Sequence, residues 1–296
     1  MNIQEAFPHI PFLQNEPMSR HTTFRIGGPA QWFVQPRLSE LRPLLSYCKE
    51  EQIPVTVIGN GSNLLVGDKG IRGLVIALGQ KAAELRVEDR CIHAQAGALL
   101  SQVAAEALAH SLHGLEFAAG IPGTLGGAVL MNAGAYDGEM RDVLVSVDVL
   151  RTDGQIETWQ RDELDLSYRH SRMMDEHVIV LSAVMQLEPG DACEIRGRMD
   201  ELRARRQEKQ PLSYPSAGST FKRPAGHFAG KLIMDAGLAG YQVGGAAVSE
   251  KHCGFVINRG DATAEDVRQL MEDVTRKVFE QSGVRLEPEV RFVGDF

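Results

Sequence analysis

The chain has 296 residues, of which 43% are hydrophobic and 24% are charged, as is typical of globular proteins with packed cores. Its formal net charge of −8 argues against nucleic acid as the main partner, because nucleic-acid binding calls for a basic face. The four cysteines form no C-x-x-C motif, and no stretch approaches the roughly 18 apolar residues of a membrane-spanning helix.

The N-terminal part of the chain shows no targeting pattern and then alternates predicted helices with predicted strands. Residues 1–12 have neither a basic start nor an apolar core, so we do not predict a signal peptide and expect a cytoplasmic protein. A helix is predicted from Ser39 to Glu51, with Ser39 as its N-cap, and another over 99–110. Strands are predicted over 55–58, 74–77, 91–96, 143–151, 155–159 and 178–187.

The most informative segment is the glycine-rich stretch 118–136, which reads AAGIPGTLGGAVLMNAGAY. Its glycines stand among apolar residues, so we predict a buried, ordered loop and not a flexible linker. A second glycine loop, 59–63 (GNGSN), directly follows the predicted strand 55–58. Backbone N–H groups in such loops form concave sites for anions. Together the two loops indicate a site for the phosphates of a nucleotide cofactor.

Two common phosphate-binding motifs do not match these loops. The dinucleotide motif G-x-G-x-x-G fails because Leu64 stands where the third glycine belongs and a strand-like segment follows it. The P-loop motif fails because neither loop carries Gly-Lys-Ser/Thr. We therefore predict that two loops bind the phosphates without the help of a helix dipole. The alternative at this stage is glycine-rich hairpin turns in an all-β protein.

The second half of the chain begins with a highly charged segment, 191–210, which has a helical pattern and ends at Pro211. Its charges are typical of a solvated helix face, and its position also suits a connector between domains. The remainder predicts a smaller α/β unit. Its expected elements are a helix over 230–237, strands over 243–248 and 254–258, a helix from 263 to 281 and a terminal strand over 284–293.

Three polar features of the sequence are candidates for chemistry. The loop 215–224 gathers serine, threonine and two cations between glycine and proline, a pattern found both in ligand sites and in ordinary connectors. Arg169 and Glu289 stand in short motifs that could carry chemistry. The simpler explanation of Arg169 is a surface arginine, and that of Glu289 is one half of an ion pair on the same face of a strand. His110 and His113 lack a third ligand, so we predict no metal site.

Taken in order along the chain, these motifs resemble those of the UDP-N-acetylenolpyruvoylglucosamine reductase family, flavoenzymes of bacterial peptidoglycan precursor synthesis. The resemblance covers nearly the whole sequence. The matching stretches are TFRIGG at 23–28, GNGSNLL at 59–65, GIPG at 120–123, NAGAY at 132–136, YR at 168–169, AGSTFK at 217–222 and EPEVR at 287–291. The glycine loops alone match the wider vanillyl-alcohol-oxidase-type FAD fold, and the serine loop and the EPEV ending narrow the match to the reductase.

The resemblance implies an α+β protein with a two-subdomain FAD-binding fold followed by a smaller α/β substrate-binding domain. The subdomains would span 1–72 and 73–190, the substrate domain would span 191–284, and the terminal strand 285–296 would return to the first subdomain. NADPH would be the hydride-donating co-substrate, and FAD would be bound noncovalently. The residues implied to bind FAD are Gly59, Asn60, Gly61, Ser62, Asn63, Gly120, Ile121, Pro122, Gly123, Thr124, Gly127, Asn132, Gly134 and Ala135.

The catalytic arginine, serine and glutamate of the family fall on Arg169, Ser219 and Glu289. Hydride addition to the vinyl carbon remote from the substrate carboxylate creates an enolate. Arg169 and a protonated or hydrogen-bonding Glu289 would stabilise that enolate where its charge develops. Ser219 would then deliver a proton as general acid, helped by nearby positive charge such as that of Lys222.

The same resemblance implies a sugar-nucleotide substrate and no nucleic-acid, membrane or obligate protein partner. Candidate substrate-binding residues are Lys209, Tyr214, Lys222, Arg223 and His252. The chain departs from the family in two places. Between Arg169 and Val184 there is no room for the tyrosine-bearing insertion of one form, and Arg223 stands where the family has an asparagine.

Two other functions remain open from the sequence. The first is an FAD-dependent oxidase or dehydrogenase of the same fold that acts on an alcohol or a sugar. The second is a noncatalytic nucleotide-binding protein in which the glycine loops hold phosphate and Ser219 is structural.

Overall fold

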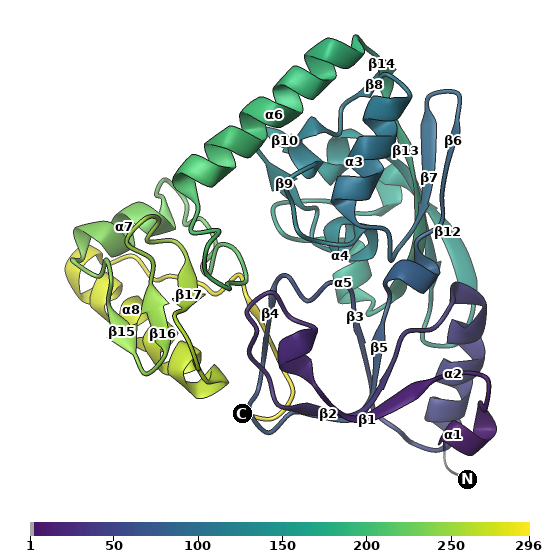
Figure 1. Cartoon of the computed structure of the whole chain (residues 1–296), viewed down its shortest axis with the longest axis horizontal. Helices are drawn as coiled ribbons and strands as arrows, with labels where there is room; N and C mark the ends of the chain where they lie inside the picture. The colour runs from purple at the N-terminus through teal and green to yellow at the C-terminus, as the bar shows by residue number, and fades with distance from the viewer. Residues whose placement is uncertain (1–2) are drawn as a thin grey trace. The chain divides into compact units, whose positions relative to one another are not determined.

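The structure is a computed structural model that describes residues 3–296, and Figure 1 shows the chain. The chain divides into two compact units, each built from three segments. Unit 1 comprises Met1–Phe12, Val34–Asn60 and Leu74–Arg206, and unit 2 comprises Leu13–Phe33, Gly61–Gly73 and Gln207–Phe296. The division falls inside the predicted cofactor loop 59–63. The predicted domain boundaries at 72, 190 and 284 stay a prediction.

A five-stranded antiparallel sheet forms the core of unit 1. Its strands are, in spatial order, β12 (Ile156–Gln160), β11 (Leu144–Leu150), β13 (Ile179–Gln186), β7 (Cys91–Gln95) and β6 (Leu85–Glu88). In β11, Val147 is fully buried and pairs with Trp159 on one side and Ala183 on the other. Helices α3 (Leu100–Ala109) and α4 (Leu125–Leu130) pack beside the sheet (Figure 1). The predicted hairpin 143–159 is confirmed.

The remaining part of unit 1 contains a parallel strand pair, several helices and two short antiparallel strand pairs. β3 (Val55–Ile58) pairs with the second part of β5 (Ile71–Ala77). Helix α2 begins one residue earlier than predicted, and Ser39 is not its N-cap. Instead, the Arg37 N–H donates to the Glu40 carboxylate at 2.8 Å, which satisfies the helix start. The other elements are α1 (Ile3–Ala6), α2 (Leu38–Glu50), β8 (Leu112–His113), β9 (Gly134–Ala135), β10 (Gly138–Glu139), α5 (Arg172–Asp175), β14 (Glu188–Pro189), α6 (Ala192–Lys209) and the 3-10 helices η2 (Gln80–Ala82), η3 (Glu116–Ala118), η4 (Met140–Asp142) and η5 (Arg161–Glu163).

The sequence predicted one continuous loop over the glycine stretch 118–136, and this prediction is wrong. Helix α4 lies in its middle because Leu125, Ala128 and Val129 share a buried face. Gly126 allows this helix to approach the sheet closely, since a Cβ there would lie 2.9 Å from the Ala96 Cβ. The stretch therefore contains a helix that the sequence did not predict, and binding of the phosphates by the two loops stays a prediction.

Helix α6 agrees closely with the charged helix predicted over 191–210. Ile195, Met199 and Leu202 form its buried face, and most of its other side chains are exposed. The boundary between the units follows Arg206, in its last turn.

Unit 2 is built on a three-stranded antiparallel sheet, β15 (Gln242–Val243), β16 (Ala246–Val248) and β17 (Val256–Asn258), with α7 (Ala229–Asp235) and α8 (Ala264–Ser282). The single strand predicted over 243–248 is wrong, because the chain turns between β15 and β16. Gly244 adopts φ +51°, and a Cβ there would lie 2.3 Å from an Asp266 carboxylate oxygen. The unit also contains η1 (Met18–Arg20), β4 (Leu64–Val66), β18 (Arg291–Val293) and most of β1 (Phe12–Pro17) and β2 (Pro29–Val34).

Helix α8 has a strongly determined N-terminus. Thr263 is the N-cap, as the predicted start of this helix implies, and its hydroxyl accepts the Asp266 N–H at 3.0 Å. The Asp68 carboxylate accepts two further helix N–H groups, those of Ala264 at 2.8 Å and Glu265 at 3.1 Å. These bonds attach the Gly61–Gly73 segment to the C-terminal part of the same unit.

The terminal strand predicted over 284–293 is much shorter in the structure. Only β18 (Arg291–Val293) forms a regular ladder, parallel to β4 (Leu64–Val66). The preceding residues cannot continue it because Pro288 lacks an N–H group and the backbone around it pairs instead with residues 220–222.

Candidate active site

In unit 1 the glycine-rich segments of the two predicted loops lie against each other. The Asn60 side-chain amide donates to the Pro122 carbonyl at 2.6 Å. Gly59 faces Thr124 so closely that a Cβ on residue 59 would lie 2.1 Å from Thr124 Oγ1. A side chain at position 59 would have to displace the Thr124 hydroxyl, so glycine favours the close approach of the two segments.

The backbone of the 120–124 segment has the properties of an anion site. The Gly123 carbonyl accepts the Leu100 N–H at 3.0 Å, and Leu125 donates to the Ala98 carbonyl at 2.8 Å. Among residues 3–296, no hydrogen-bond partner is found for the N–H groups of Gly123 and Thr124. Two adjacent free donors in a glycine loop suit a phosphate oxygen.

Asn132 and Arg169 flank the second part of the glycine stretch. Asn132 is fully buried, and its side chain donates to Glu139 and to the Ser167 carbonyl and accepts the Arg141 N–H. These bonds make Asn132 a brace of its own loop. Arg169 has φ +57° and donates from Nη2 to the Gly134 carbonyl at 3.4 Å. The structure thus brings Arg169 next to the predicted cofactor residues at 134–135.

In unit 2 the second half of the 59–63 loop meets the end of the chain. Gly61 has φ +60°, and a Cβ there would lie 2.1 Å from the His21 carbonyl oxygen. The Asn63 amide donates to the Glu289 carbonyl at 3.0 Å, and the Asn63 carbonyl accepts the Arg291 N–H at 3.0 Å. Ser62, between them, is partly exposed.

The serine loop pairs with the EPEV motif in the same unit. The Lys222 N–H donates to the Glu287 carbonyl at 2.8 Å, and the Glu289 N–H donates to the Thr220 carbonyl at 2.9 Å. Thr220 is buried, and its hydroxyl accepts the Val256 N–H, whereas the adjacent Ser219 is exposed. This pairing fixes the backbones of Ser219 and Glu289 beside each other and leaves the serine hydroxyl accessible.

The predicted substrate-binding residues of unit 2 differ in their surroundings. Lys222 Nζ lies 3.5 Å from a Glu287 carboxylate oxygen, in the segment paired with the serine loop. The Arg223 guanidinium lies 3.9 Å from the centroid of the Phe228 ring. Lys209 and Tyr214 are exposed. Of the five candidates, Lys222 and Arg223 belong to the serine loop itself.

His252, the fifth candidate, is held as a neutral imidazole. Its Nδ1 accepts the Gly254 N–H at 3.1 Å, and its ring packs edge-on against Phe255. Burial lowers the pKa of His252. The proton of the neutral ring is therefore on Nε2.

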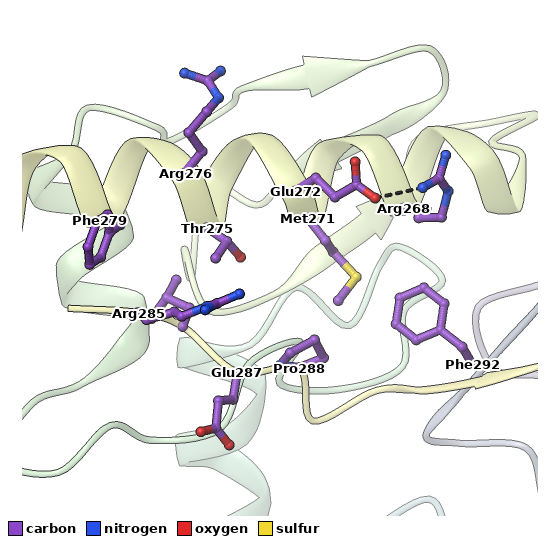
Figure 2. A pocket seen from close by; sticks show the side chains of 11 residues that line it. Arg268, Met271, Glu272, Thr275, Arg276, Phe279, Arg285, Glu287, Pro288 and Phe292 are labelled. Atoms are coloured by element: carbon purple, nitrogen blue, oxygen red, sulfur yellow. Dashed lines mark hydrogen bonds and ion pairs between the residues drawn. The ribbon is translucent and has the colours of Figure 1, made fainter. Parts of the chain in front are cut away.

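A groove of about 980 Å³ in unit 2 runs between α8 and residues 285–292 (Figure 2). Two of its three arginines already have carboxylate partners on α8. Arg268 pairs with Glu272 at 2.6 Å, as Figure 2 shows, and Arg276 pairs with Glu280 at 3.2 Å. Neither Ser219 nor Glu289 lines the groove.

Two arginines outside the predicted set have unusual environments, Arg206 in unit 1 and Arg291 in unit 2. Burial lowers the pKa of each guanidinium. The sequence did not single out Arg206, because it lies in the charged segment 191–210, which was predicted to be solvated. Its contact with the glycine stretch distinguishes Arg206 from the other arginines of that segment. Among residues 3–296 no group of histidine, cysteine and acidic side chains could hold a metal ion, and no helix has the length and apolar character to span a membrane.

The fold and the paired glycine segments define a flavin-binding protein. A family model described as "FAD binding domain" matches residues 31–159. A second model, "UDP-N-acetylenolpyruvoylglucosamine reductase, C-terminal domain", matches residues 210–293. The chain is 58% identical to the UDP-N-acetylenolpyruvoylglucosamine reductase of Agathobacter rectalis, over 100% of this chain and 98% of the relative. It is 54% identical to that of Caldanaerobacter subterraneus subsp. tengcongensis, over 95% and 93%.

A solved structure agrees with these relatives. The reductase from Thermus caldophilus superposes with a TM-score of 0.82 at 36% identity, covering 96% of this chain and 98% of that one. The chain belongs to the UDP-N-acetylenolpyruvoylglucosamine reductase family. The predicted α+β architecture, with an FAD-binding part followed by a smaller C-terminal domain, is confirmed.

Family membership makes the chain an FAD-containing oxidoreductase of peptidoglycan precursor synthesis, with NADPH as co-substrate and a sugar nucleotide as substrate. It decides against both alternatives left open by the sequence, the alcohol or sugar oxidase and the noncatalytic nucleotide-binding protein. The paired segments at 59–60 and 122–124 fit FAD, because they offer closely approachable backbone and free N–H donors to its pyrophosphate.

Proposed function

We propose that this chain uses NADPH to reduce the enolpyruvyl group of UDP-N-acetylglucosamine enolpyruvate, giving UDP-N-acetylmuramate, with Arg169, Ser219 and Glu289 as its catalytic residues. The observation that carries the residue assignment is the backbone pairing of Thr220 with Glu289, which sets an exposed serine beside a glutamate in one unit. FAD, when bound, supplies the two-electron relay that passes hydride from NADPH to the substrate.

The residues proposed to hold FAD form two groups. In unit 1 they are Gly59, Asn60, Gly120, Ile121, Pro122, Gly123, Thr124, Gly127, Asn132, Gly134 and Ala135, and in unit 2 they are Gly61, Ser62 and Asn63. The free N–H groups of Gly123 and Thr124 bind pyrophosphate oxygens. Asn132 does not contact FAD through its side chain, because its polar atoms are already bonded to Glu139, Arg141 and Ser167. It supports FAD binding by fixing the loop in which it lies.

Arg169 and a protonated or hydrogen-bonding Glu289 stabilise negative charge on the substrate. Hydride adds to the terminal vinyl carbon, and the electron pair of the double bond moves onto the carboxylate as an enolate. The Arg169 guanidinium is held by the Gly134 carbonyl, so it is oriented before the reaction begins. Donors that are fixed in advance stabilise developing charge without reorganisation.

Ser219 supplies the proton that completes the reaction. It transfers the proton to the carbon that bears the carboxylate, and the enolate collapses to the lactyl ether. A serine hydroxyl is a weak acid, so positive charge from Lys222 assists by stabilising the alkoxide. Lys222 is on the same loop, three residues further along the chain.

Lys209, Tyr214, Lys222, Arg223 and His252 are proposed to contact the sugar nucleotide. The three cations among the first four suit its diphosphate, and the exposed Tyr214 ring suits stacking against its base. We further propose that the enzyme acts in the cytoplasm and needs no protein partner.

The test is an anaerobic two-step reaction. Purified holoprotein is bleached with one equivalent of NADPH, and UDP-N-acetylglucosamine enolpyruvate is then added. We expect the flavin absorbance to return and the mass of UDP-N-acetylmuramate to appear. Reduced flavin that ignores this substrate but reacts rapidly with oxygen would overturn the proposal in favour of an oxidase.

A further inference from the structure

Arg206 differs from the neighbouring arginines of α6. Arg198 and Arg205 both pair with Glu201, and Arg203 lies 3.6 Å from Asp200. Within residues 3–296, no ion pair or hydrogen bond is found for the Arg206 guanidinium. The Arg206 side chain is nevertheless half-buried. A desolvated charge without a counter-charge is costly, so a partner is missing from the protein itself.

The Arg206 side chain lies directly on the glycine stretch. A Cβ on Gly120 would lie 3.3 Å from Arg206 Cδ and 3.4 Å from Arg206 Nη1. Phe117 and Tyr136 line the same small cavity. Glycine at position 120 therefore gives the guanidinium room beside the backbone.

The carboxylate nearest in the lining does not serve as the counter-charge. Glu116 borders this cavity, but its Oε2 accepts the Gly114 N–H at 2.9 Å, and it forms no ion pair with Arg206. The 120–124 segment that begins at Gly120 also carries the free N–H groups of Gly123 and Thr124. Free N–H donors on this segment and an unpaired guanidinium of α6 packed against its Gly120 suit an anion from outside the protein.

We propose that Arg206 binds a phosphate of a nucleotide diphosphate held against the 120–124 segment. A guanidinium offers a planar fork of donors that matches two phosphate oxygens at once. Two sources supply this chemistry, the pyrophosphate of FAD and the diphosphate of NADPH or the sugar nucleotide. The inference rests on the proposed function only for the identity of those nucleotides.

The test compares Arg206→Met with the matched variant Arg205→Met, which removes an exposed charge from the next position of the helix. One arm titrates the apoproteins with FAD by flavin fluorescence, at low and high salt. The other arm measures binding of NADP⁺ and of UDP to the holoproteins by calorimetry. Arg206→Met should weaken one of these affinities about tenfold to a hundredfold, and less so at high salt.

A loss in the first arm assigns Arg206 to FAD, and a loss in the second arm, with FAD binding intact, assigns it to a transient nucleotide. Unchanged affinities in both arms, or equal losses in Arg205→Met, would overturn the proposal. If Arg206→Met fails to fold, Arg206→Lys keeps charge and packing but lacks the fork, and it should give a smaller loss in the same arm. Substrate-dependent reoxidation of the wild-type protein is independent of this result.

Discussion

The side-chain amide of Asn63 donates a hydrogen bond of 3.0 Å to the backbone carbonyl of Glu289, 226 residues further along the chain. Asn63 belongs to the first predicted cofactor loop, and Glu289 is a proposed catalytic residue. The parallel pairing of β4 with β18 continues the same contact, with Leu64 opposite Arg291. Unit 2 therefore joins one end of the predicted FAD loop to the segment that carries the proposed catalytic glutamate.

Replacing Ser219 with alanine should separate the two half-reactions. Reduction of the flavin by NADPH does not involve the serine proton and should proceed at nearly the wild-type rate. Reoxidation by the enolpyruvyl substrate should slow by about 10²–10⁴-fold, the usual contribution of a general acid. Anaerobic stopped-flow absorbance measures both steps. Ser213→Ala, an exposed serine earlier in the same region, is the control, and survival of both steps in Ser219→Ala would remove the serine from the mechanism.

Gly59→Ala should destabilise unit 1 and weaken FAD binding. The new Cβ would lie 2.1 Å from Thr124 Oγ1, and such overpacking costs about 1–3 kcal/mol. The second variant, Gly59→Ala with Thr124→Ala, removes that oxygen and should recover part of the lost free energy of unfolding, measured by urea denaturation. If the double variant is less stable than the sum of the single variants predicts, the contact is not the cause.

Gly197→Ala should stabilise the protein. Gly197 is exposed within α6, and a Cβ there would meet no atom within 4 Å in the described chain. Alanine in a helix interior is favoured over glycine by about 0.5–1 kcal/mol. Thermal denaturation should show a higher melting temperature with FAD binding unchanged. A lower melting temperature would mean that α6 is strained at this turn.

His252 should make stability depend on pH in a specific direction. Burial lowers the pKa of His252 in the folded state, so the unfolded chain binds more protons at this site. The free energy of unfolding should therefore fall as pH drops below about 6.5, the ordinary histidine value, and level off below the folded pKa. Above about pH 6.5 the contribution of His252 to the free energy of unfolding is constant.

The variant His252→Asn tests this, because an asparagine carbonyl can accept the Gly254 N–H in place of Nδ1. Urea denaturation between pH 5 and pH 8 should give a flatter curve for His252→Asn than for the wild type. His227→Asn, which changes an exposed histidine of the same unit, should follow the wild-type curve. Parallel curves for wild type and His252→Asn would contradict the prediction.

Local patterns determined most of the secondary structure. The helix that begins after Thr263 and the hairpin of β11 and β12 follow from capping and turn residues that act over a few positions. The errors arose where a distant contact decided the conformation. Helix α4 forms because its apolar face packs in the core. The strand expected over 284–293 begins only at Arg291 because the preceding backbone pairs with the serine loop.

The sequence by itself determined the family, the cofactor and the candidate catalytic residues, because short motifs keep their residue types and order. Only the tertiary structure decided which backbone groups of those motifs are already bonded and which are free. Gly123 and Thr124 keep unbonded N–H groups, Asn132 does not keep free polar atoms, and Arg206 lacks a counter-charge among residues 3–296. Such differences depend on partners far away in the sequence, and the charge pattern along a single helix contains no information about them.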